Sequence, residues 1–328
     1  MQEKCILEVN KMYDKKICLL LSLGDNIGND SPTRPTATGE VFNTKLLTEK
    51  PAWDEIVEKA KESGVNTIVI DLADGVKYKS HPELHLENGW TPEFMTEEVR
   101  RLKSMGFNVV PKLNFSAAHD AWLGIYGRML ATPDYYEVVK ELIYEVCDIF
   151  ETPELFHIGM NGEDEASQRS LTFAAYRQHE LLMHDINFML QCVRDKGVRP
   201  WMWADIAAKN FDSFCENVGK DVLVSPYYVN HMYSDPQAPL IDAPDHVNMR
   251  DSYKKLTEAG YEILPCGTNH LHNGYSFEHN VRFTKENAVW DKVSGFMITS
   301  WRSTTERNKY RIFAALQHVK DAKESFLD

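Results

Sequence analysis

The stretch Ser63-Gly64-Val65-Asn66-Thr67-Ile68-Val69-Ile70 joins the end of a helix to a buried strand through a glycine, and it decides the predicted fold. Glycine adopts the left-handed conformation that ends a helix without strain. The same joint returns three times, as Met105-Gly106 before Val109-Val110-Pro111, Lys196-Gly197 before Pro200-Trp201-Met202-Trp203, and Ala259-Gly260 before Ile263-Leu264-Pro265. The repeating unit is therefore a strand plus a helix.

Helix starts are marked as regularly as helix ends. Thr91-Pro92-Glu93 and Thr132-Pro133-Asp134 each offer a capping hydroxyl, a proline at the first helical position and an acid in the first turn. Apolar runs predict eight strands, near residues 17–23, 67–72, 108–115, 155–160, 200–205, 222–229, 262–268 and 295–301. Eight such units predict an α/β protein with one domain over residues 1–328, a (β/α)8 barrel, with a doubly wound open sheet as the alternative.

Composition excludes several classes of protein. The formal net charge of −13 argues against a nucleic-acid or anionic-membrane partner, because both need a basic surface. The six cysteines show no CxxC spacing, and no run approaches the roughly 20 apolar residues of a membrane helix. We find no signal peptide, so we expect a cytoplasmic protein, or a periplasmic or secreted one if a signal was removed. No cofactor or metal is predicted, and the oligomeric state is not indicated.

In a (β/α)8 barrel the active site lies at the C-terminal ends of the strands. Those ends hold aromatic residues beside acids, which is what a sugar site needs, because ring faces stack on a pyranose while polar groups bind its hydroxyls. In chain order, the candidate substrate-binding residues are Asp71, Asp74, Lys112, Asn114, His119, His157, Trp203, Tyr227, Tyr228, Asn269 and Trp301, and the candidate catalytic residues are Glu163, Asp164, Glu165 and Asp205.

Each candidate has a structural alternative. The three acids that follow Leu155-Phe156-His157-Ile158-Gly159-Met160-Asn161-Gly162 form either a site or a solvated helix start, since acids favour the first turn of a helix. Asp205 can instead cap the following helix. The tryptophans can be core residues, and a lone histidine such as His157 is more often structural than catalytic. Lys112 lies inside an apolar strand, so its ammonium needs a partner such as Asp71 or Glu163.

The residues His157-Ile158-Gly159-Met160, followed by acids, resemble the His-x-Gly-Gly-Asp-Glu motif of family 20 glycoside hydrolases, the β-N-acetylhexosaminidases. The segments Lys112-Leu113-Asn114-Phe115-Ser116 and Trp122-Leu123-Gly124 are similar to those of bacterial barrel proteins described as distant relatives of that family. The resemblance implies that Glu165 is the general acid and that Asp164 orients an acetamido nucleophile.

This sequence departs from the motif. Met160 replaces the second glycine, and Asn161-Gly162 precede the acids. The direct register puts Asn161 and Gly162 at the catalytic pair, so we expect either a bulged loop that realigns Asp164 and Glu165 or a role for Glu163 and Asp164.

The leading hypothesis is a glycosidase whose acid is Glu163 or Glu165, with Asp164, Asp205 or Asp74 as the opposing carboxylate. One alternative is a metal-dependent sugar isomerase or lyase that uses Glu163, Asp205 and His270 as ligands. The other alternative is a carbohydrate-binding barrel without catalysis. The polar segment from Gly24 to about Thr44, which holds Arg34, is long enough to be a functional loop.

Overall fold

The computed structural model describes residues 15–36, 40–227, 245–270 and 276–327, and in it eight parallel strands form a nearly closed barrel. The hydrogen-bonded order is β6-β5-β4-β3-β2-β1-β8-β7. Single parallel bridges from Val224 to Ile263 and from Tyr227 to Cys266 join β6 to the β7 side. The strands are β1 (Lys16–Ser22), β2 (Thr67–Asp71), β3 (Asn108–Lys112), β4 (Leu155–His157), β5 (Arg199–Trp203), β6 (Leu223–Ser225), β7 (Cys266–Thr268) and β8 (Gly295–Ser303). The predicted barrel is confirmed.

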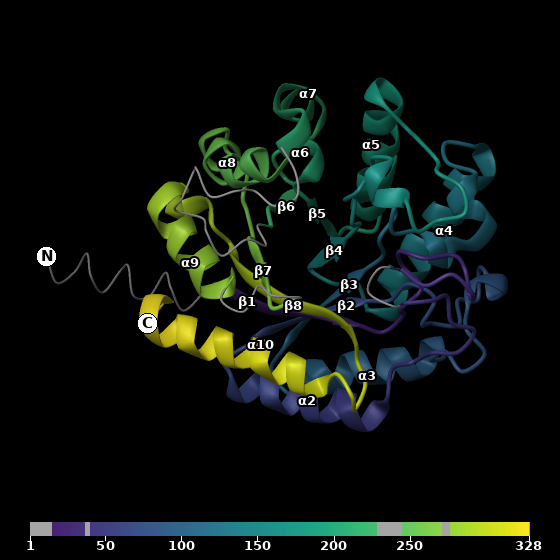
Figure 1. Ribbon diagram of the computed structural model, residues 1–328, viewed down its shortest axis with the longest axis horizontal. Coiled ribbons are helices and arrows are strands. Elements are labelled where there is room, and N and C mark those ends of the chain that lie inside the picture. The colour runs from purple at the N-terminus through teal and green to yellow at the C-terminus, as the bar shows by residue number, and fades with distance from the viewer. Residues whose placement is uncertain (1–14, 37–39, 228–244, 271–275, 328) are drawn as a thin grey trace, which may run out of the picture.

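Helices surround these strands (Figure 1). The first and last of the described ring helices, α2 and α10, lie side by side, so the two ends of the described chain close the outer layer. The helices are α2 (Lys50–Glu62), α3 (Pro92–Ser104), α4 (Pro133–Ile149), α5 (His179–Asp195), α6 (Asp205–Lys209), α7 (Phe211–Asn217), α8 (Asp245–Glu258), α9 (Ser276–Asn287) and α10 (Lys309–Ala322), with short helical turns at Pro82–Leu84, Ala121–Arg128, Ala166–Gln168, Trp290–Lys292 and Lys323–Leu327.

Two apolar cores follow from the alternation of side chains along each strand. The smaller core includes Leu20, Val69, Val110, Trp201 and Met297, whose positions in five strands place it in the barrel interior. The larger one lies between the sheet and the helices, and α4 contributes to it the apolar stripe expected from the sequence. Among the described helices, none combines the length and the apolar character that a membrane crossing requires.

The glycine joints have the predicted conformation. The φ angles are 82° at Gly64, 93° at Gly106, 71° at Gly197 and 93° at Gly260, all in the left-handed region. Each helix therefore ends where the sequence indicated, and the chain enters the next strand at the N-terminal end of the barrel. The opposite end of the barrel is left to the longer, polar connections.

The predicted caps of α3 and α4 are also present. Thr91 Oγ1 accepts the amide N–H of Phe94 at 3.2 Å, and Thr132 Oγ1 accepts that of Tyr135 at 3.3 Å.

We expect Thr132→Ala to lower the free energy of unfolding by about 1 kcal/mol, because the amide that Thr132 now caps loses its acceptor. Urea denaturation followed by circular dichroism measures the change. Thr132→Ser is the matched control, since it keeps the hydroxyl and should stay close to wild type. An alanine variant as stable as the serine variant would contradict the assigned cap.

Candidate active site

A cavity of about 1010 Å³ lies at the C-terminal ends of the strands, where the barrel fold places active sites. Residues 25–36 and 40–47, which follow β1, supply part of its wall, so the described parts of the polar segment anticipated as a functional loop contribute to the site. Of the candidate residues, those that line the cavity are Asp71, Lys112, Asn114, His119, Trp203, Asp205, Tyr227 and Trp301.

Asp205 is the cavity carboxylate with the clearest chemistry. It begins α6 directly after β5, and its Oδ1 accepts the Tyr227 hydroxyl at 2.8 Å. Its Oδ2 is buried and has no hydrogen-bond partner among the described residues. Burial raises the pKa of Asp205 to about 7, although the Tyr227 hydroxyl and the charge of Lys209 oppose that rise. This carboxyl group can therefore hold a proton at neutral pH.

Aromatic rings form a continuous wall beside Asp205. The ring of Tyr227 lies 5.5 Å from that of Trp203 and 6.2 Å from that of Trp301, centroid to centroid. Trp301 has a φ of 45°, which is uncommon outside glycine, and its amide donates to Thr299 Oγ1 at 3.1 Å. All three rings line the cavity, as a wall that stacks on sugar rings would.

The floor at β2 and β3 holds a buried ion pair. Asp71 and Lys112 face each other in the sheet register, and the Lys112 ammonium contacts Asp71 Oδ2. Burial raises the pKa of Asp71, and Lys112 offsets part of that effect. Lys112 thus has the partner its position demanded. Asp74 does not line the cavity: its Oδ2 accepts Asn26 Nδ2 at 2.6 Å, and burial raises its pKa to about 7.

A tight turn after β4 brings Asn161 to the cavity. Gly159 and Met160 both have positive φ, at 77° and 71°. A Cβ at Gly159 would lie 1.9 Å from Asn114 Oδ1, so only glycine fits there. Asn114 Nδ2 in turn donates to Asn161 Oδ1 at 3.0 Å. This packing presents Asn161 and Gly162 to the cavity.

Both histidines near this turn are neutral at physiological pH. Burial lowers the pKa of His119 to about 4, and its Nδ1 lies 3.1 Å from the Asn161 carbonyl oxygen. Burial also lowers the pKa of His157, whose Nδ1 accepts the Gly159 amide at 2.9 Å. His157 lies 4.8 Å from the Trp203 ring and does not line the cavity, so it supports the aromatic wall from behind.

The three consecutive acids do not line the cavity. Glu163 Oε1 accepts the Ala117 amide at 2.8 Å and Arg177 Nη2 at 3.0 Å. Asp164 accepts a hydrogen bond from Lys209 Nζ at 2.6 Å. Burial raises the pKa of Asp164, but the hydrogen bonds to its carboxylate and the charge of Lys209 outweigh burial and hold that pKa below the usual value. Glu165 is exposed. A catalytic role for these acids would require the loop to rearrange.

The remaining candidates divide between cavity and scaffold. His270 lines the cavity, whereas the Asn269 side chain turns away and donates to the Arg311 carbonyl oxygen at 2.8 Å. Arg34 donates to the Ser170 carbonyl oxygen at 3.1 Å and does not line the cavity. Tyr228, which was also a candidate, lies outside the described residues.

Other cavity residues were not among the candidates. Asp25 lines the cavity, and burial raises its pKa to about 7. Asp25 follows β1 much as Asp71 ends β2, and this similarity of position is the sequence feature that could have identified Asp25 as a candidate. Arg302, Arg307 and Arg311 line the cavity from β8 and the start of α10. Their spacing in the sequence did not indicate a site, because exposed arginines are common on helices.

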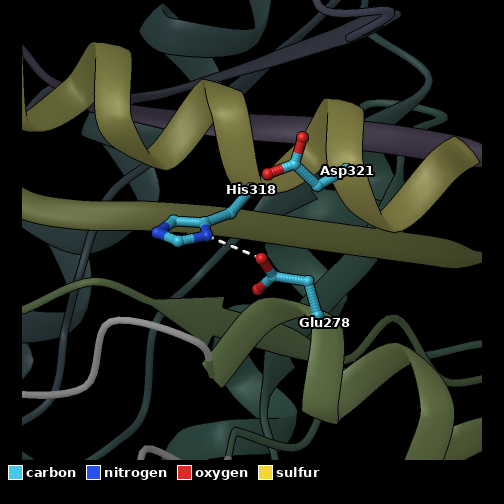
Figure 2. Close-up of side chains that lie close together, drawn as sticks. All are labelled: Glu278, His318 and Asp321. Carbon is cyan, nitrogen blue, oxygen red and sulfur yellow. Dashed lines mark hydrogen bonds and ion pairs between the residues drawn. The ribbon is translucent and has the colours of Figure 1, made fainter. Parts of the chain in front are cut away.

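One side-chain cluster in the described residues has the geometry to hold a metal ion. Glu278 on α9 and His318 and Asp321 on α10 place their ligand atoms within 4.8 Å of one another (Figure 2). His318 Nδ1 lies 2.6 Å from Glu278 Oε1, which ties the two helices together. None of the three lines the cavity, so this cluster is separate from the candidate active site.

Neither a family model nor a curated protein matches this sequence. Solved structures do match the fold. A family 20 exo-β-N-acetylglucosaminidase from Vibrio harveyi, in complex with N-acetylglucosamine, aligns with 94% of this chain at 14% identity and a TM-score of 0.61. Dispersin B aligns with 94% of the chain at 15% identity and a TM-score of 0.62. The β-N-acetylhexosaminidase of Bacteroides fragilis aligns with 93% at 14% identity and a TM-score of 0.61.

The fold is that of family 20 glycoside hydrolases. The chain covers 54% of the Vibrio harveyi protein, 65% of the Bacteroides fragilis one and 99% of dispersin B. The resemblance seen in the sequence is thus confirmed as a likeness of fold. Asn161 and Gly162, which the sequence motif in its direct register would place at the acidic pair of the family, line the cavity.

We expect Glu163→Ala to lower the free energy of unfolding by about 3 kcal/mol, because it leaves part of the buried Arg177 charge unpaired. Glu165→Ala should stay within about 0.5 kcal/mol of wild type, since Glu165 is exposed. Urea denaturation of both variants measures the difference. Equal stability of the two variants would mean that the loop is not anchored through Glu163.

Proposed function

We propose that this protein is a glycosidase whose general acid is Asp205. The observation that carries the proposal is a buried carboxyl group, with a pKa of about 7, that faces a cavity walled by aromatic rings. A general acid must be protonated before it donates to the glycosidic oxygen, and its most useful pKa lies near the working pH. The fold shared with family 20 enzymes supports the same class of reaction.

Asp71 supplies the second carboxylate. It faces the cavity from β2, three strands away from β5 in the order of the sheet. Burial raises the pKa of Asp71, and the Lys112 ammonium beside it offsets part of that effect, so Lys112 is the group that favours the carboxylate form needed to activate water or to stabilise the oxocarbenium ion. Asp205 thus gives a proton to the leaving oxygen while Asp71 acts on the sugar from another wall.

The other polar groups hold the substrate. Trp203, Tyr227 and Trp301 stack on the sugar ring, and the Asn114 and Asn161 amides bind hydroxyls. The Asn161 carbonyl oxygen takes the single proton of neutral His119 at Nδ1, so Nε2 is left to accept a hydrogen bond from a sugar hydroxyl. The catalytic acid of this proposal comes from β5 instead of β4.

A second candidate function is sugar binding without turnover. It is favoured by Asn161 and Gly162, neither of which can donate a proton at the position where the family has its acids. The metal-dependent isomerase or lyase has less support, because Glu163, one of its three ligands, is bound to Arg177 outside the cavity.

We expect Asp205→Asn to lower kcat/KM at least a hundredfold on whichever aryl glycoside of a panel the wild type cleaves best, since the amide cannot donate the proton. Asp74→Asn is the matched control, because Asp74 is equally buried but does not line the cavity. Wild-type activity in Asp205→Asn would refute the assignment. Sugar binding without cleavage of any glycoside would instead favour the binding function.

We expect Tyr227→Phe to move the alkaline limb of the pH profile of kcat/KM to higher pH. The acid form of Asp205 is the active one, so activity falls as pH rises through its pKa of about 7. The Tyr227 hydroxyl stabilises the carboxylate form, and its loss raises that pKa. Tyr144→Phe removes a similar hydroxyl–aspartate contact outside the cavity and should leave the limb in place. A limb unmoved in Tyr227→Phe would mean that another group titrates.

A further inference from the structure

Three arginines gather on one side of the cavity, although the chain as a whole carries a net charge of −13. Arg302 lies near the end of β8, Arg307 lies in the following turn, and Arg311 lies in the first turn of α10. The turn and helix start follow β8 directly, so one short segment delivers all three guanidinium groups. The Asn308 side chain and His270 line the same cavity.

Of the acids close to this segment, Glu306 is engaged outside the three arginines, and Glu40 lies beside Arg302. Glu306 lies 2.6 Å from Lys309 Nζ, which also contacts Glu55 at 2.9 Å. Arg302 Nη1 lies 3.5 Å from Glu40 Oε1, while Arg302 Nε is buried and makes no hydrogen bond to a described residue. Within the described residues, Arg307 and Arg311 form no ion pair. The segment therefore offers the cavity more positive charge than its own acids neutralise.

The charges also act on a neighbouring group inside the cavity. Burial lowers the pKa of His270, and the charges of Arg302 and Arg311 lower it further. Both guanidinium groups are thus close enough to His270 for their charges to reach it. Neutral His270 adds a hydrogen-bonding group without adding charge.

We propose that Arg302, Arg307 and Arg311 form an anion subsite, which binds the acidic group of a negatively charged glycan. The planar guanidinium group binds carboxylate, sulfate and phosphate through paired N–H donors, so arginine suits an oxyanion better than lysine does. The first-turn amides of α10 add favourable electrostatics at the same place. The ligand is a sugar that carries a uronate, a sulfate ester or a phosphate ester.

This subsite extends the proposed glycosidase function by naming a substrate class, and its position is consistent with that role. Trp301 lies next to Arg302 in β8. The Trp301 ring centroid is 6.2 Å from that of Tyr227, and the Tyr227 hydroxyl donates to Asp205. A sugar stacked on Trp301 can therefore direct an acidic substituent to the arginines while Asp205 remains available to its glycosidic oxygen. Exposed Arg307 and Arg311 lie at the entrance, where long-range attraction also speeds the capture of an anionic ligand.

Binding is the test, because it does not depend on turnover. Isothermal titration calorimetry of the full chain would use glucuronic acid, N-acetylglucosamine 6-sulfate, N-acetylglucosamine 6-phosphate and neutral N-acetylglucosamine, each at low and high salt. We expect at least one acidic sugar to bind tenfold or more tightly than the neutral one, with an advantage that shrinks at high salt. Preference for the uronate or for the esters identifies the acidic group.

The double variant Arg307→Gln, Arg311→Gln should reduce binding of that acidic sugar at least tenfold and leave the neutral sugar unaffected. Both arginines are exposed, so the fold should be preserved, and a thermal melt verifies this. Arg169→Gln removes an exposed arginine outside the cavity and serves as the control for net charge. Arg307→Lys, Arg311→Lys should recover part of the affinity, because the charge returns without the paired donors.

Equal affinity for acidic and neutral sugars would overturn the subsite, as would undiminished binding by the double glutamine variant. Failure of the glycosidase proposal is a separate result. Tight binding of acidic sugars without cleavage would support the anion subsite and contradict the glycosidase proposal. Cleavage of neutral glycosides with no preference for acidic ones would support the glycosidase proposal and contradict the anion subsite.

Discussion

The buried guanidinium group of Arg177 determines which residues of the loop after β4 line the cavity. A charge with no exposed surface must keep its partners, because leaving it unpaired costs several kcal/mol. Glu163 and Asp185 meet that need, and the backbone oxygen of Phe115 adds a further hydrogen bond. With Glu163 held there, the turn after β4 offers Asn161 and Gly162 to the cavity. The residues of this turn that line the cavity thus follow from an ion pair that lies outside the cavity lining.

The cavity carries different charge on its different walls. Asp71 and Lys112 balance each other at β2 and β3, and Asp205 at β5 holds its proton near neutral pH. The segment that follows β8 brings the excess positive charge. Such a division suits the proposed ligand, whose acidic substituent would lie at the arginines and whose glycosidic bond would lie at the carboxyl groups.

The fold could be predicted from the sequence because its signals are local. A glycine such as Gly64 and a cap such as Thr132 act within one turn of a helix. The eight predicted strands, with helical patterns between them, then indicate a barrel. The strand ends likewise predicted the aromatic wall and Asp205. The direction of the β4 acids could not be predicted, since it depends on Arg177, which lies 14 residues beyond Glu163 and packs under the loop. The place of Asp25 in the cavity could not be predicted either, because it depends on how deeply the loop after β1 is buried.

Trp301 shows how the aromatic wall is tied to the protein's stability. Its φ of 45° places a large side chain in a backbone region that costs of order 1–2 kcal/mol for residues other than glycine. Glycine at this position would relieve that strain but would also remove the ring that lines the cavity, together with its contacts with Tyr227 and His270. The backbone thus carries a strain at the point where the ring joins the cavity wall, and strain of this kind is found mainly at ligand-binding and catalytic sites.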